Sequence, residues 1–98
     1  MYARVITVLV DVYRMDRAIE IYEEDVLPAI KMREGGVGAM LLVDRSSGRG
    51  VSISLWEDKE ALLAAQESGF MQDQIRKFTA MLIGTPDVEA LEVAIKDP

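Results

Sequence analysis

The stretch that decides the fold spans residues 51 to 62 and reads VSISLWEDKEAL. Its first part, Val51 to Glu57, alternates apolar side chains with serines and a tryptophan, which is typical of a β-strand. Asp58 then stands where a helix-capping residue belongs, and we expect a helix over Lys59 to Glu67. A strand that leads directly into a capped helix is therefore the first unit of the fold.

Two more strands precede this unit. Val37 to Asp44 predicts the first arm of a hairpin with Val51 to Glu57, because the polar residues 45 to 50 between them include two glycines. Tyr2 to Val12 is rich in Val, Ile and Thr and predicts the first strand of the chain. The strand at Tyr2 to Val12 and the one at Val37 to Asp44 are both apolar on two faces, so we expect both of their faces to be covered.

A long helix is predicted between the first two strands. Apolar residues recur at spacings of three and four over Met15 to Arg33. Pro28 lacks an N–H group and crowds the preceding turn, so we expect a kink or a break there. Gly35-Gly36 supplies the left-handed residue that ends the helix.

The C-terminal part predicts one more helix and one more strand. Ser68-Gly69 interrupts the helix that Asp58 begins, and a further helical stretch follows with one apolar stripe, formed by Met71, Ile75, Phe78 and Leu82. Gly84-Thr85-Pro86 breaks the pattern, and Val88 to Ile95 predicts the last strand. The order β-α-β-β-α-β predicts a single ferredoxin-like α+β domain over residues 1–98, with a four-stranded antiparallel sheet.

Composition excludes several classes of partner. The chain has 98 residues, with 11 Lys and Arg against 17 Asp and Glu, for a net charge of −6. No dense basic patch exists for nucleic acid or for an anionic membrane surface. No cysteine is present, and no uncharged apolar run reaches the length that crosses a bilayer. We therefore expect a cytoplasmic protein with no nucleic-acid or membrane partner.

The apolar residues are too many for one monomer. Half of the residues are hydrophobic, and the helices of such a chain cover only one face of its sheet. The other face would leave an apolar patch larger than monomers normally expose. A homodimer that pairs through this sheet face is the simplest way to bury it.

At this point the sequence resembles the dimeric α+β barrel superfamily, and within it the antibiotic-biosynthesis-monooxygenase-like (ABM) group. The resemblance covers nearly the whole chain and rests on Val5 to Val10, Val26-Leu27-Pro28-Ala29, Gly36-Val37-Gly38 and, most strongly, Ser54 to Leu62. It implies a pocket between sheet and helices. Some members oxidise aromatic or quinol-like substrates with oxygen and without metal or flavin, whereas others degrade haem.

The resemblance also implies candidate substrate-binding residues. Thr7 and Trp56 fall near the pocket positions that recur in catalytic members, and Gln66 falls near a histidine of many relatives. Trp56 would stack on a planar substrate or simply fill the core. Thr7, with Ser52 and Ser54, would bind a substrate oxygen or serve only as a strand residue.

Two further residues carry alternatives. Tyr22 would donate to a substrate oxygen or pack in the core, because it lies on the buried stripe of its helix. Arg4, on the first strand, would neutralise an anionic ligand or pair across strands, and the second reading is favoured.

The chain departs from its relatives in having no histidine. The haem-degrading members need an axial imidazole, and Gln74 or Ile75 takes its place here, so haem degradation is not expected. A serine triad also needs a histidine as its base, so an ordinary triad is excluded. The acidic run Glu23-Glu24-Asp25 predicts a solvated helix face and no metal site. Two hypotheses follow: a cofactor-independent monooxygenase-like enzyme acting on a small aromatic or quinol-type molecule, or a non-catalytic small-molecule-binding or structural dimer.

Overall fold

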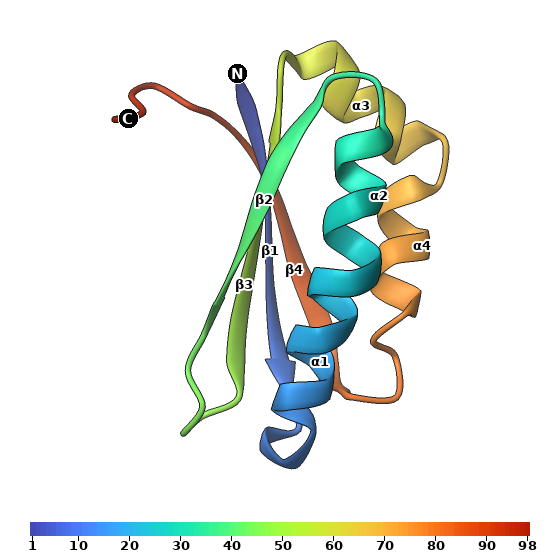
Figure 1. Cartoon of the computed structure of the whole chain (residues 1–98), viewed down its shortest axis with the longest axis vertical. Helices are drawn as coiled ribbons and strands as arrows, with labels where there is room; N and C mark the ends of the chain where they lie inside the picture. Colours follow the sequence, from blue (N-terminus) through green and yellow to red (C-terminus); the bar gives the residue numbers. More distant parts are fainter.

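Four strands form one antiparallel sheet in the order β2-β3-β1-β4. The computed structural model describes all 98 residues, and Figure 1 shows the sheet with its helices on one side. The strands are β1 (Tyr2–Val10), β2 (Gly36–Val43), β3 (Arg49–Trp56) and β4 (Leu82–Glu92). The predicted ferredoxin-like α+β fold with a four-stranded antiparallel sheet is confirmed.

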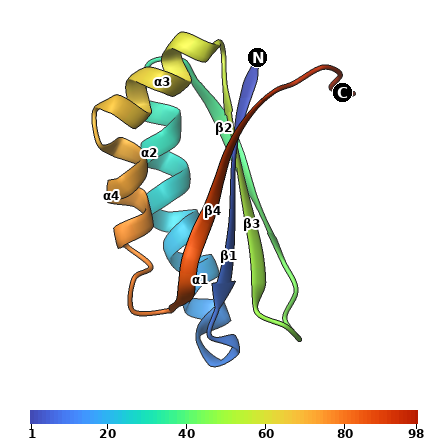
Figure 2. The ribbon, with the colours of Figure 1, turned by 180° about the vertical axis from the view of Figure 1, so that it is seen from behind.

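Two helical segments pack on the sheet. The first follows a short 3-10 turn, η1 (Val12–Arg14), and runs through α1 (Met15–Ile21), a π-helical turn η2 (Tyr22–Val26) and α2 (Leu27–Met32). The second comprises α3 (Lys59–Glu67) and α4 (Phe70–Arg76). Figures 1 and 2, which view the molecule from opposite sides, both show these helices on the same face of the sheet.

The first helix accommodates Pro28 without ending there. A break or kink was expected at this proline, but the chain stays helical and widens into the π turn just before it. The N–H of Leu27 bonds to the carbonyl of Tyr22, five residues back. Such a turn holds one extra residue, which gives the backbone room beside a ring that cannot donate a hydrogen bond.

Local signals set the helix ends where the sequence predicts them. A side-chain oxygen of Asp58 accepts a hydrogen bond from the N–H of Ala61 at 2.8 Å and caps α3. The first helical segment ends at Met32, where Arg33 turns extended, and Gly35 follows in the next turn with the left-handed φ of 79° that the sequence predicts there. A Cβ atom at this glycine would also overlap the side chain of Ala61, so both backbone conformation and space require glycine.

The last strand differs from the prediction at both ends. It was expected over Val88 to Ile95, but β4 begins at Leu82 and ends at Glu92. Gly84 does not interrupt it, because a φ of 74° lets the chain pass through a register shift opposite Thr7 and Leu9. The helix before it, α4, ends at Arg76. Leu82, which the apolar stripe assigned to that helix, is the first residue of β4.

The sheet has one covered face and one open face. The covered face carries the even-numbered residues of β1, whose neighbours on β3 are also even-numbered. The open face carries Leu9, Met40, Leu42, Ile83 and Leu91, which are 41 to 56% exposed. The sheet is therefore apolar on both sides, as predicted, and one side has no cover within this chain. No helix is long and apolar enough to cross a membrane.

Candidate functional site

A cavity lies between the covered face of the sheet and the helices. Its volume is about 100 Å³, and 18 of its 24 lining residues are hydrophobic. Members of both core clusters line it, including Trp56 and Leu62 from one cluster and Val10 and Met15 from the other. Both clusters of the core thus contribute to the cavity wall.

The cavity is small by the measure of ligand sites. An apolar cavity of roughly 150 Å³ binds benzene, and drug-sized pockets have roughly 300 to 1,000 Å³. A volume of about 100 Å³ therefore leaves room for one six-membered ring at most. Its polar lining residues are few: Arg4, Ser52, Ser54, Gln66, Gln74 and Tyr22.

Trp56 lies in the cavity wall, where β3 meets α3. It is 3% exposed, and its indole N–H donates to the hydroxyl of Ser54 at 3.0 Å. The ring of Phe70 meets the indole edge to face, with ring centroids 6.2 Å apart. Because the indole N–H already has a partner, Trp56 offers a ligand its ring surface rather than a free donor.

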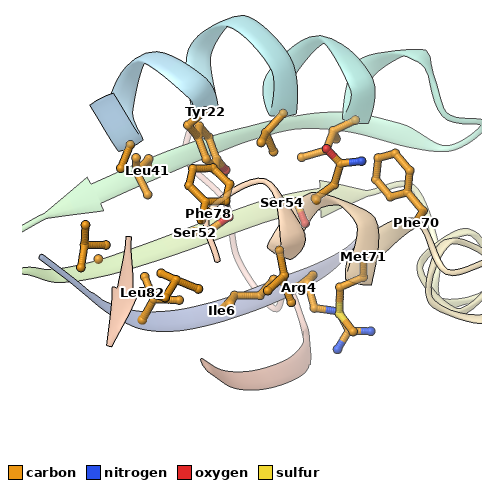
Figure 3. A pocket seen from close by; sticks show the side chains of 18 of the residues that line it. Arg4, Ile6, Tyr22, Leu41, Ser52, Ser54, Phe70, Met71, Phe78 and Leu82 are labelled. Atoms are coloured by element: carbon orange, nitrogen blue, oxygen red, sulfur yellow. Dashed lines mark hydrogen bonds between the residues drawn. The ribbon is translucent and has the colours of Figure 1, made fainter. Parts of the chain in front are cut away.

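Tyr22 reaches from the π turn to the two strands at the sheet edge. Its hydroxyl lies 2.9 Å from the hydroxyl of Ser52 and 3.2 Å from the carbonyl oxygen of Met40, to which it donates. Figure 3 shows the ring projecting from its helix toward Ser52. Burial raises the pKa of Tyr22, and the hydrogen bond with Ser52 opposes that shift. Tyr22 is therefore a neutral phenol at physiological pH.

Arg4 is the one cationic residue in the lining. It is 8% exposed, and its neighbours across the sheet are Ser54 and Ala90, neither of which is acidic. No ion pair involves it, so the favoured reading of cross-strand charge pairing is wrong. Its guanidinium donates to the side-chain oxygen of Gln66. Burial lowers the pKa of Arg4, although arginine stays charged at physiological pH.

The structure brings three of the four predicted site residues together. Tyr22, Trp56 and Gln66 line the cavity; that they bind a substrate stays a prediction. Thr7 does not line it. Thr7 pairs with Val51 on β3 and with Asp87 on β4, on the open face, so its expected place in the pocket is wrong. The pairing register decides this, because neighbours in a strand point to opposite faces.

Sequence reasoning missed other lining residues. Ile6, Phe70 and Arg4 reach the cavity. The sequence offers Arg4 an anion-binding role or a cross-strand pairing role, but does not predict its place in the lining. The sequence did contain a signal for part of the lining. All four residues of the predicted apolar stripe, Met71, Ile75, Phe78 and Leu82, line the cavity. In Figure 3, Arg4, Met71 and Phe70 lie toward one end of the cavity, and Leu41 and Leu82 toward the other.

The residues present do not fit a haem or a metal ion. The cavity is far smaller than a haem macrocycle, and Gln74 and Ile75 line it where relatives were expected to supply an imidazole. No group of three or more His, Cys, Asp or Glu side chains could hold a metal ion. Glu23, Glu24 and Asp25 are exposed on the first helical segment.

No family model matches the sequence. Two uncharacterised proteins of Mycobacterium tuberculosis strain H37Rv are similar in sequence. One is 39% identical over 94 residues, which are 95% of this chain and 41% of that protein. The other is 36% identical over 95 residues, which are 96% of this chain and 39% of that protein. The chain spans about two fifths of the length of these curated relatives.

Solved structures with this fold include proteins with known ligands. A monooxygenase of Streptomyces coelicolor in complex with nanaomycin D has a TM-score of 0.75 at 18% identity, over 99% of this chain and 91% of that one. A cofactor-independent oxygenase of Streptomyces nogalater has a TM-score of 0.72 at 16% identity, over 99% and 96%. A haem-degrading protein of Mycobacterium tuberculosis with two haems bound has a TM-score of 0.75 at 15% identity, over 100% of both chains.

These likenesses define the class of fold. The chain has the same fold as these solved structures, and this is the fold that its sequence resemblance implied.

Proposed function

We propose that this chain is a cofactor-independent monooxygenase-like protein that acts on a small aromatic molecule of quinol type. The observation that carries the proposal is the apolar cavity between sheet and helices, with Trp56 and Phe70 in its wall and a few polar groups that could orient one ring. Its volume of about 100 Å³ favours a single-ring compound over a polycyclic one.

The reaction balances without any cofactor. A quinol and dioxygen give a hydroxyquinone and water: one oxygen atom forms a bond to a ring carbon, and the other leaves as water. The substrate supplies all of the electrons. The chain would bind and orient the ring, exclude bulk water and hold the substrate's oxygens, with Gln66 and Ser52 among the polar groups in the lining.

The chain itself contributes no strong base to this cavity. No carboxylate lines it, and Tyr22 is a neutral phenol whose pKa is raised by burial. The proton of the quinol must therefore pass to water, so the proposal requires a substrate that ionises readily. The same observation favours a second candidate function, a non-catalytic domain that only binds a small aromatic molecule.

Oxygen uptake separates the two functions. The purified chain is mixed with single-ring benzoquinols, and with anthrone as a larger comparison, in an oxygen electrode. We expect uptake above the uncatalysed rate for at least one single-ring quinol. Ile6→Phe, which fills the cavity, should abolish that uptake, whereas Leu63→Phe, on the exposed side of α3, should preserve it.

Two other results would count against an enzyme that works in the cavity. Uptake that survives in Ile6→Phe, with the circular dichroism spectrum unchanged, would locate the reaction outside the cavity and contradict the proposal. No uptake across the panel, combined with binding of the same quinols measured by Trp56 fluorescence, would favour the non-catalytic function.

The proposal includes a homodimer in the cytoplasm. The open face carries five large apolar side chains that are 41 to 56% exposed, and half-buried Val5, Val51, Ile53 and Leu55 lie among them. Monomers rarely expose a continuous apolar patch above a few hundred Å². A second copy of this face would bury it and leave each cavity on the outer side of its own sheet, next to the helices.

A further inference from the structure

We propose that the cavity is selective for single-ring aromatic oxyanions, with the guanidinium of Arg4 as the group that binds the negative oxygen. This inference rests on the proposed function for the aromatic ring and adds the charge of the ligand. It starts from one unusual feature, a cation that is 8% exposed and has no acidic partner.

Buried arginines in proteins are normally paired with a carboxylate, because removing a charge from water is unfavourable. Arg4 makes a single side-chain hydrogen bond, from one terminal nitrogen to the neutral amide oxygen of Gln66. The positive charge is therefore not neutralised by any residue of the chain. A ligand that brings a negative oxygen would complete the site.

The free donors of Arg4 are accessible to such a ligand. A guanidinium carries five N–H groups, and Gln66 takes one of them. No buried side-chain nitrogen or oxygen lacks a hydrogen-bond partner, so the unpartnered nitrogens of Arg4 are not sealed inside the protein. Because Arg4 lines the cavity, these donors are open to a molecule that enters it.

The surroundings of Arg4 select for an aromatic body on the anion. Ser54 is its neighbour on β3, and the hydroxyl of Ser54 accepts from Trp56. Phe70 and Met71 lie toward the same end of the cavity in Figure 3. A ring bound against these apolar side chains would bring its oxyanion to Arg4, where a planar guanidinium matches a carboxylate in two hydrogen bonds or a phenolate in one.

Gln66 is the residue that a ligand would displace or join. Gln66 is exposed on α3, yet its side-chain oxygen reaches the cavity and accepts a hydrogen bond from Arg4. Its amide can turn to offer an N–H to the same anion, since a glutamine carries both an acceptor and a donor. Gln66 is therefore assigned a positioning role, and Arg4 the binding role.

Binding of a matched pair of probes tests the charge. Benzoate and benzamide have nearly the same shape and differ in charge, and Trp56, the only tryptophan of the chain, reports ligand entry by its fluorescence. We expect wild type to bind benzoate at least tenfold more tightly than benzamide. Arg4→Met should remove this preference, and Arg4→Lys should retain part of it.

Arg33→Met is the matched control. Arg33 stacks on the Phe70 ring at 5.0 Å and does not line the cavity, so its loss should leave the preference within about twofold. A preference that falls equally in Arg33→Met and Arg4→Met would mean that general charge attraction, not contact with Arg4, selects the anion, and the proposal would be overturned.

A second probe distinguishes phenolate from carboxylate. At the pH where free 4-nitrophenol is half ionised, excess wild-type protein should increase the visible absorbance of its phenolate, because a nearby guanidinium favours the anion. Arg4→Met should not increase it. A rise in phenolate without selective benzoate binding would assign the site to phenolates, and the reverse result would assign it to carboxylates.

Equal binding of benzoate and benzamide to wild type, together with no rise in 4-nitrophenolate, overturns the proposal, as does the absence of binding of either probe class. The outcome is separable from that of the proposed function. Selective anion binding without oxygen uptake would support the site and contradict the enzyme, whereas oxygen uptake that is unchanged in Arg4→Met would support the enzyme and contradict the anion site. Arg4→Lys, which keeps the charge, covers the case in which Arg4→Met does not fold.

Discussion

The hydroxyl of Tyr22 lies 2.9 Å from the hydroxyl of Ser52 and joins the first helical segment to β3 across the cavity lining. The same hydroxyl also donates to the carbonyl of Met40 on β2. One phenol thus ties the π turn to two neighbouring strands. Tyr22 and Ser52 both line the cavity, which is otherwise mostly apolar. Water replaces a lost hydrogen bond poorly in such a place.

Replacing this phenol by phenylalanine should weaken the fold. Tyr22→Phe keeps the ring and leaves Ser52 and the Met40 carbonyl with one partner fewer, so the free energy of unfolding should fall by about 1 to 2 kcal/mol. Urea denaturation followed by circular dichroism measures the change. Tyr13→Phe is the control, because Tyr13 is 95% exposed, and it should change stability by less than about 0.5 kcal/mol. Equal effects of the two variants would contradict the role given to Tyr22.

The ionisation of Tyr22 should make stability depend on alkaline pH. Burial raises its pKa, so the neutral phenol is favoured in the folded state. The corresponding stabilisation is complete below the unfolded-state pKa of about 10 and is lost as the pH rises through the higher folded-state pKa. The free energy of unfolding should therefore fall more steeply above about pH 10 in wild type than in Tyr22→Phe. Parallel curves for the two proteins would show that Tyr22 ionises alike in both states.

Arg4 should lower the stability of the ligand-free chain. Its side chain is largely buried and has no acidic partner, and burial lowers its pKa, which means that the cation is disfavoured in the fold. Arg4→Met, similar in length and apolar, should raise the free energy of unfolding by up to about 1 kcal/mol. Thermal denaturation of the ligand-free wild type and of Arg4→Met measures this change in the free energy of unfolding.

The control for this variant is Arg17→Met. Arg17 pairs with Glu20 on an exposed helix face, and such pairs contribute about 0.5 kcal/mol or less. A clear loss of stability in Arg4→Met, larger than in Arg17→Met, would indicate that Arg4 supports the fold rather than a ligand.

The proposed dimer predicts a charge-sensitive sheet face. Leu42 is 49% exposed and lies beside Val51 on the open face. A lysine at this position would bring a charge into the centre of the buried interface, where it would have no water and no partner. Leu42→Lys should therefore be a monomer in light scattering at concentrations where wild type is a dimer.

Leu63→Lys tests whether any exposed lysine has this effect. Leu63 is 37% exposed on α3, on the helical side of the molecule, and its replacement should leave the dimer intact. A wild-type monomer, or a dimer that survives Leu42→Lys, would contradict pairing through the sheet.

The sequence by itself determined the order and type of the elements. The period-two pattern of residues 51 to 56, the cap at Asp58 and the glycines at 35 and 69 act within a few residues of where they stand, so local physics is enough to place them. The apolar character of both sheet faces is visible in the same way, because side chains alternate along each strand. The stripe at Met71, Ile75 and Phe78 also marked part of the cavity lining.

Only the tertiary structure decided which face of each strand looks into the cavity. When both faces of a strand are apolar, the pattern does not distinguish the helix side from the open side, and Thr7 was assigned to the wrong one. The tertiary structure also decided the environment of Arg4, since its partner Gln66 is 62 positions away. A contact between distant residues depends on strand register and helix packing, which belong to the folded chain as a whole and to no local stretch of it.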